Sequence, residues 1–136
     1  MFYIVALLAL PSLLWGAFSI RERQPNWRHT VIENHENGNP KLVIFHEAGE
    51  PVKEVILYPN GAIKSEADLI GDHYHGGCRL FHANGALAKR CVYSQGQLDG
   101  PVESFYPGGQ VESRCSYCRG EKEGAWLQLY DNGNKK

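Results

Sequence analysis

The sequence predicts an all-β fold, an elongated antiparallel meander of repeated β-hairpins after an N-terminal apolar helix. The first observation behind this prediction is a series of evenly spaced glycines: Gly38, Gly61, Gly85, Gly109 and Gly133, which are 23, 24, 24 and 24 residues apart. The second is that apolar and polar residues alternate between these glycines, as in strands with one buried face. A helix, with its period of about 3.6 residues, would mix the two kinds of side chain on every face.

The chain opens with an apolar leader, residues 1–19. Residues 2–20 carry no charge, and Ala17 and Ser19 supply small side chains at the two positions that a signal peptidase reads. No Lys or Arg precedes this run, however, and its 19 uncharged residues approach the roughly 20 that span a bilayer. We expect a cleaved signal peptide and a secreted, periplasmic or cell-envelope protein. The alternatives are a membrane anchor formed by residues 2–20, with Arg21 and Arg23 favouring a cytoplasmic repeat domain, and an ordinary buried segment.

Two further segments follow the leader. Residues 20–36 mix charges, one proline and isolated apolar residues without a sustained period, which predicts a linker. Residues 37–136 hold about four repeats of 24 residues and form the predicted repeat domain. The formal net charge of the chain is -1, so the sequence lacks the basic surface typical of nucleic-acid-binding proteins.

Each repeat is predicted to be a hairpin. Tyr-Pro-Asn-Gly at 58–61 suits a tight turn, because proline presets its backbone dihedral and glycine accepts a positive φ. Further glycines recur between the repeats, and we interpret residues 96–100 and 120–124 as return loops that join one hairpin to the next. One hairpin cannot bury its own apolar face, so stability is expected to rise with the number of stacked hairpins.

Four cysteines lie in the repeats: Cys78, Cys91, Cys115 and Cys118. A two-residue loop at Asn84-Gly85 would place Cys78 directly opposite Cys91, where the geometry allows a cross-strand disulfide. A three-residue loop with a glycine bulge would place the two on opposite faces. In an oxidising compartment this pair is the candidate disulfide, and two small buried thiols are the alternative. Cys91 and Cys115 are repeat-equivalent and two strands apart, beyond disulfide reach.

Two other clusters carry weaker signals. Cys115 and Cys118 form a C-x-x-C, but it lies in a strand and its return loop rather than at a helix start, which disfavours a redox motif. Asp72, His73, His75 and Cys78 crowd one loop, yet their spacing matches no closed zinc site, and solvated histidines are the simpler interpretation. We predict no catalytic residue, no metal and no cofactor, because no paired carboxylates and no Ser-His or Cys-His arrangement point to catalysis.

The aromatic residues of the repeats form the candidate interaction face. Tyr58, Tyr106 and Tyr130 recur three residues before a turn glycine, and Trp126 lies shortly before the last of them. We expect these rings to form columns at the centre of the sheet's broad face and to contact a partner there, since aromatic residues are enriched at interface cores. Packing within the sheet is the alternative at such alternating positions.

The cadence Gly-x-Trp-x-x-x-Tyr-x-Asn-Gly-x-Leu resembles the variant form of the MORN repeat. The segments GAWLQLYDNG (124–133), GPVESFYPGGQV (100–111) and ILYPNGAIKSEADLIGDHYHG (56–76) carry the likeness, which covers about residues 38–133 and departs most in the first unit. The resemblance implies a twisted antiparallel sheet of hairpins and transfers no catalytic residue. Bacterial members of this family are called antitoxin-like, and classical MORN proteins are described as membrane-associated or scaffold-forming.

From these observations we predict a non-enzymatic, exported or membrane-tethered repeat protein that acts as an interaction module for an unknown protein partner. Peripheral binding of lipid headgroups is one alternative, which the near-neutral charge disfavours because anionic lipids attract clustered Lys or Arg. An antitoxin role is another, but it requires a soluble cytoplasmic protein, which the apolar leader contradicts. No nucleic-acid partner is expected.

Overall fold

The computed structural model describes residues 27–136, which form one antiparallel sheet of ten strands. The strands are β1 (Arg28–Asn34), β2 (Pro40–Glu47), β3 (Glu50–Leu57), β4 (Ile63–Ile70), β5 (His73–Phe81), β6 (Leu87–Ser94), β7 (Gln97–Leu98), β8 (Gly100–Phe105), β9 (Val111–Cys118) and β10 (Glu121–Gln128). The predicted all-β meander is confirmed. Residues 27–136 contain no helix with the length and hydropathy needed to cross a membrane. The expected N-terminal helix and the leader lie outside the described residues.

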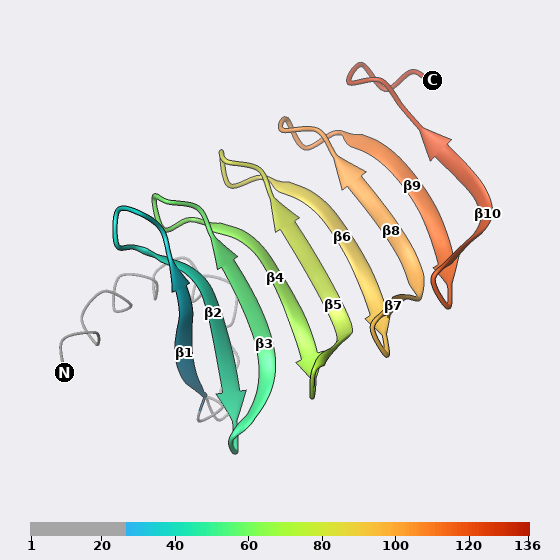
Figure 1. Cartoon of the computed structure of the whole chain (residues 1–136). Helices are drawn as coiled ribbons and strands as arrows, with labels where there is room; N and C mark the ends of the chain where they lie inside the picture. Colours follow the sequence, from blue (N-terminus) through green and yellow to red (C-terminus); the bar gives the residue numbers. More distant parts are fainter. Residues whose placement is uncertain (1–26) are drawn as a thin grey trace, which may run out of the picture.

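Strands that are neighbours in the sequence are also neighbours in the sheet. The order is β1-β2-β3-β4-β5-β6-β8-β9-β10, and the short β7 pairs with β6 beside this path. Figure 1 shows the result as a single layer of hairpins laid side by side, with the repeat turns along one edge and the return turns along the opposite edge. Among the described strands, β1 and β10 are therefore the two outer strands of the sheet.

The turn glycines adopt a backbone conformation with positive φ, which glycine accepts more readily than other residues. Gly85 has a φ of 86°, in the left-handed region. Two backbone hydrogen bonds close its turn, from the His82 amide to the Ala86 carbonyl at 2.8 Å and from the Gly85 amide to the His82 carbonyl at 2.9 Å. The loop therefore has three residues and a glycine bulge, which is the second of the two loops that the sequence leaves open. Asn84 supports this turn, because its side-chain oxygen accepts the Ala86 amide at 3.0 Å.

A second irregularity beside the turn restores the register of the hairpin. The pairing of β5 with β6 shifts by one residue between Leu80 and Phe81. The same shift occurs in the β3–β4 and β8–β9 hairpins, next to their own turns. Because the two bulges compensate, Cys78 lies directly opposite Cys91 although the loop has three residues.

Two-residue turns join successive hairpins at the other edge. Both residues of three of these turns have a positive φ. The values are 52° and 90° in Ala48-Gly49, 49° and 80° in Gln95-Gly96, and 49° and 83° in Arg119-Gly120. This is the signature of the type I′ turn, whose twist matches that of the flanking strands. The return loops predicted at 96–100 and 120–124 are corrected accordingly. Strand pairing resumes directly after the turn, with β7, β8 and β10 occupying most of those residues.

The first strand, β1, lies inside the segment 20–36 for which the sequence predicts a linker. It pairs with β2, and Val31 lies opposite Val43. All seven of its residues are exposed, as expected for a strand with one neighbour. An outer strand needs no apolar face of its own, which explains why its sequence shows no sustained period.

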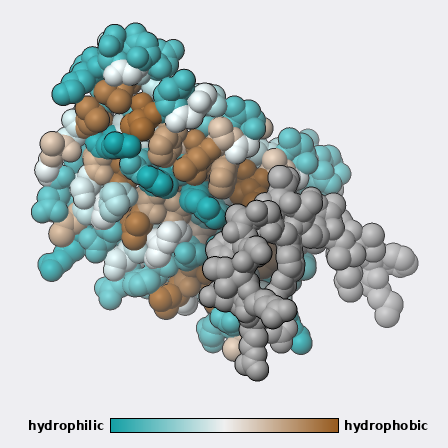
Figure 2. All heavy atoms as spheres, turned by 180° about the vertical axis from the view of Figure 1, so that it is seen from behind, coloured by the Kyte–Doolittle hydropathy of each residue, from teal (hydrophilic) through white to brown (hydrophobic). Residues whose placement is uncertain are grey.

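Two small hydrophobic clusters lie on opposite faces of the sheet. One consists of Val43, Val55 and Leu57, with Phe45 and Ile63 packed against it. The other consists of Ala67, Cys78, Cys91 and Val102, with Tyr74, Tyr93, Leu98, Cys115 and Tyr117 packed against it. Val55 lies opposite Glu66, the neighbour of Ala67 in the chain, and successive residues of a strand point to opposite faces. Figure 2 shows hydrophobic patches interrupted by hydrophilic side chains on the face seen from behind.

Candidate interaction surfaces

A ladder of side-chain hydrogen bonds follows the edge that carries the repeat turns. We call it the turn ladder, and its members are His35, Tyr58, His82 and Tyr106. The Tyr58 hydroxyl donates to the Phe81 carbonyl at 2.8 Å, and the Tyr106 hydroxyl donates to the Leu129 carbonyl at 2.9 Å. Nε2 of each histidine hydrogen-bonds a carbonyl of the following repeat at 2.8 to 2.9 Å. Each repeat is thereby tied to the next.

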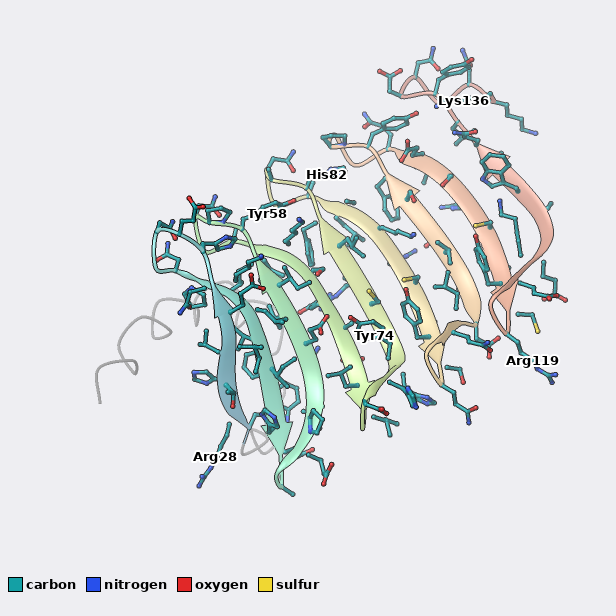
Figure 3. All side chains as sticks on the ribbon, viewed as in Figure 1. Arg28, Tyr58, Tyr74, His82, Arg119 and Lys136 are labelled. Atoms are coloured by element: carbon teal, nitrogen blue, oxygen red, sulfur yellow. The ribbon has the colours of Figure 1, made fainter. Side chains whose placement is uncertain are left out.

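The turn ladder corrects the expected place of the tyrosines. Tyr58 and Tyr106 lie on the turn edge and not at the centre of the broad face, because each directly precedes a repeat turn. Figure 3 shows Tyr58 and His82 along this edge. Asparagines of the same turns add a second contact, since Asn84 Nδ2 donates to the Pro107 carbonyl of the following turn at 3.1 Å. Tyr58 and Tyr106 therefore bind the backbone of the next repeat and do not form a free aromatic column.

The other two candidate aromatics lie at the C-terminal end of the sheet. Trp126 is 56% exposed and Tyr130 is 50% exposed. Trp126 has the repeat position of Val102, which is 6% exposed, and Tyr130 has that of Tyr106 in the turn ladder. Trp126 belongs to β10, whose only neighbour among the described strands is β9. We call Trp126, Tyr130 and the outer side of β10 the C-terminal edge.

Lysines lie over both rings of the C-terminal edge. Lys122 Nζ is 4.2 Å from the centre of the Trp126 ring, and Lys136 Nζ is 5.2 Å from that of Tyr130. Both distances fall within the range of cation–π attraction, worth about 0.5 to 1 kcal/mol at exposed sites. Each ring thus has a lysine contact and remains half-exposed to solvent.

The candidate disulfide pair is aligned but not bonded in the structure. Cys78 and Cys91 are buried free thiols that face each other from β5 and β6. The hydrogen bond from the Cys78 thiol lowers the pKa of Cys91 to about 7, and the same bond, together with burial, raises the pKa of Cys78. Cys115 is half-buried and Cys118 is exposed, both on β9. The disulfide stays a prediction.

The loop histidines form contacts of their own. His73 Nε2 lies 3.2 Å from the Asp72 carboxylate, and His75 Nδ1 accepts the Gln95 amide at 3.2 Å. Within residues 27–136 no group of three or more His, Cys, Asp or Glu side chains is arranged to hold a metal ion.

A row of charged side chains crosses the face opposite the cysteines. This ionic row consists of Glu66, Arg79, Arg90, Glu103 and Arg114, one from each of five neighbouring strands. Ion pairs join Arg79 to Glu66 and Arg90 to Glu103, and Arg114 Nε lies 2.8 Å from Glu103. The hydrogen bond from Arg90 lowers the pKa of Glu103 below its usual value, and Arg114 adds to the effect. Alternation in the sequence does not align these five residues, because their alignment depends on the bulges in the hairpins.

The fold and these surfaces define a class: a repeat protein made of β-hairpins in a single layer, in which side chains of one repeat bind the backbone of the next. Within that class, residues 98–119 match the family described as MORN repeat variant. The match covers β8, β9 and the turn between them. It supports the MORN likeness of the chain, whereas the antitoxin-like qualifier has no support.

Two solved structures are similar over much of the chain. The crystal structure of accessory secretory protein 1, 2 and 3 in Streptococcus pneumoniae matches with 14% identity and a TM-score of 0.47, covering 70% of this chain and 18% of that one. The crystal structure of the GtfA/B complex bound to UDP and GlcNAc matches with 13% identity and a TM-score of 0.31, covering 85% and 24%. This chain thus spans about a fifth of each matched chain. Comparison with curated proteins finds no match.

Proposed function

We propose that this chain is a non-enzymatic protein-interaction module, exported or membrane-tethered through its apolar leader, which captures a protein partner at the C-terminal edge. The likeness to a MORN repeat supports a protein-interaction or membrane-binding module. One observation carries the choice of surface. Trp126 and Tyr130 are exposed, although the residues at their repeat positions in the interior are buried or hydrogen-bonded to the next repeat.

The C-terminal edge combines two properties of a binding surface. Large, ordered aromatic rings are the side chains most enriched at binding hot spots. At the end of β10 the Lys136 amide donates to the Gln128 carbonyl at 2.9 Å, so the chain's own last residues cover that end. The rest of the outer side of β10 offers backbone groups to an extended segment, which can add to the sheet as a further strand. The lysine and glutamates at residues 121–123 disfavour indiscriminate strand pairing, so the edge is suited to a specific partner rather than to aggregation.

Mutations at the two ends of the sheet test this surface. A partner captured from the native host by the full chain would be purified and its affinity measured for Trp126→Ala, Tyr130→Ala and Trp27→Ala. Trp27 is the matched control, because it is a tryptophan that is 40% exposed beside β1, at the other end of the sheet. We expect Trp126→Ala to weaken binding by about 30-fold, as for a hot spot worth about 2 kcal/mol. Unchanged affinity in Trp126→Ala, or an equal loss in Trp27→Ala, would contradict the proposal.

The leader is tested separately. N-terminal sequencing of the protein from its host should find chains that begin after Ser19 if the signal peptide is cleaved. An intact Met1 in the membrane fraction would support the anchored form in its place. Chains with an intact Met1 in the soluble fraction would contradict both routes.

A further inference from the structure

The ionic row contains one place where like charges adjoin. Its order across the sheet is Glu66, Arg79, Arg90, Glu103, Arg114, so acidic and basic side chains alternate except between the two middle arginines. Arg79 and Arg90 lie directly opposite each other in β5 and β6, an arrangement that destabilises an antiparallel pair. No carboxylate of the ionic row lies between the two arginines, because Arg79 pairs with Glu66 on the β4 side and Arg90 pairs with Glu103 on the β8 side.

Both guanidinium groups are presented to solvent in a fixed position. The side chains of Arg79 and Arg90 are each 57% exposed, whereas Glu66 and Glu103 beside them are 6% and 15% exposed. Arg79 lies over the Phe81 ring at 6.0 Å, so an aromatic ring supports it as well as its ion pair. Arg90 lies over Phe105 at 5.7 Å in the same way. At this pair of arginines the outermost charge is therefore positive, while the Asp68 carboxylate on the β4 side is 45% exposed.

A hollow of about 370 Å³ lies beside the two arginines. Gly77, two residues before Arg79 on the same face, contributes no side chain and leaves this space open. Lys53 and Asp68 line it on the β3–β4 side and pair with each other at 3.1 Å. Of the charged side chains around the hollow, three are basic and two are acidic, namely Lys53, Arg79, Arg90, Glu66 and Asp68. Arg90 also pairs with Glu103, which in turn pairs with Arg114. With these two included, the set has four basic and three acidic side chains, and one added negative charge would balance it.

We propose that this hollow binds a carboxylate, placed between the guanidinium groups of Arg79 and Arg90, and that an acidic segment of a protein partner supplies it. Arg79 uses Nη2 and Arg90 uses Nε for the existing ion pairs, which leaves further N–H donors on each fork for a carboxylate. A carboxylate carries the single charge that balances the lining, while a phosphate near neutral pH carries more. The inference that a protein partner supplies the carboxylate rests on the proposed function, whereas the carboxylate site itself does not.

Direct binding of a defined peptide tests the site. The full chain would be titrated into a fluorescently labelled tetraglutamate peptide with blocked ends, with a tetraglutamine peptide as the neutral control. We expect Arg79→Gln and Arg90→Gln each to weaken the affinity by about tenfold, as for the loss of charge-assisted hydrogen bonds. Arg114→Gln is the matched control, because Arg114 belongs to the same row, pairs with Glu103 and is 54% exposed, yet lies outside the hollow. Its affinity should change by less than about twofold.

Further measurements keep the outcomes distinct. Arg90→Lys keeps the charge but loses the guanidinium fork, and it replaces Arg90→Gln if Arg90→Gln folds poorly. The affinity of Arg90→Lys should fall between those of wild type and Arg90→Gln. An equal loss in Arg114→Gln, or equal binding of the tetraglutamine peptide, would overturn the proposal. Stronger competition by inorganic phosphate than by acetate at equal ionic strength would overturn the choice of carboxylate. Trp126→Ala should leave peptide binding unchanged, so the failure of the C-terminal edge and the failure of this site are separate results.

Discussion

The interior repeats and the C-terminal repeat hold similar residues at the same positions and use them differently. In the interior, the Tyr106 hydroxyl binds the Leu129 carbonyl and Val102 is 6% exposed. In the C-terminal repeat, Tyr130 and Trp126 are 50% and 56% exposed. The difference shows that a repeat position favours an apolar or aromatic side chain, whereas the neighbouring strand decides whether that side chain packs or remains available for binding.

The largest expected effect concerns the interior β5–β6 hairpin. Cys78 and Cys91 face each other there, whereas Cys115 and Cys118 lie on one strand. With oxidised glutathione, we expect the Cys91 thiolate to form a mixed disulfide, which Cys78 then resolves to the Cys78–Cys91 bridge and reduced glutathione. Closing a loop of this length should stabilise the protein by about 3 kcal/mol.

Two measurements check this bridge. Mass spectrometry of alkylated peptides should find Cys78 and Cys91 joined, and the melting temperature should fall when a reductant is added. The Cys78→Ala and Cys91→Ala double variant should melt at the same temperature with and without the reductant. A bridge between Cys115 and Cys118 would contradict the prediction.

A second prediction compares a buried position with its exposed equivalent. Val102→Ala should lower the free energy of unfolding by about 2 kcal/mol, because it removes buried methyl groups and leaves a cavity in the cysteine cluster. Trp126→Ala should lower it by less than about 1 kcal/mol, since it removes an exposed ring and one cation–π contact. Urea unfolding of both variants gives the comparison. A larger loss in Trp126→Ala would show that this ring packs as interior residues do.

A third prediction removes single hydroxyl groups. Tyr106→Phe should cost about 1 kcal/mol of stability, because the Leu129 carbonyl loses its donor from the turn ladder. Tyr130→Phe removes the equivalent hydroxyl from an exposed ring and should change stability by no more than about 0.5 kcal/mol. The two free energies of unfolding decide between this account and one in which both tyrosines serve the sheet equally.

The sequence predicted the strands and repeat turns well because glycine spacing and alternation report local backbone needs directly. It failed where two local features combine. The three-residue loop at Gly85 alone would separate Cys78 from Cys91, and only the compensating shift beside Phe81 brings them together. The ionic row depends on the same bulges in several hairpins. The exposure of Trp126 likewise depends on which strands lie beside β10, which its own residues do not report.

The smallest expected effect concerns Glu103, an acidic member of the ionic row. Glu103 accepts hydrogen bonds from Arg90 and Arg114, and the one from Arg90 chiefly lowers its pKa below the ordinary value of 4.5. Because this pKa is depressed in the folded state, the carboxylate contributes stability above about pH 4.5, and the contribution is lost as the pH falls through the folded value. Glu103→Gln should therefore flatten the loss of stability between pH 6 and 3, by less than about 1 kcal/mol since its arginine partners are exposed. Denaturant unfolding at both pH values measures this. An equally steep loss of stability at low pH in Glu103→Gln would show that other carboxylates cause the acid sensitivity.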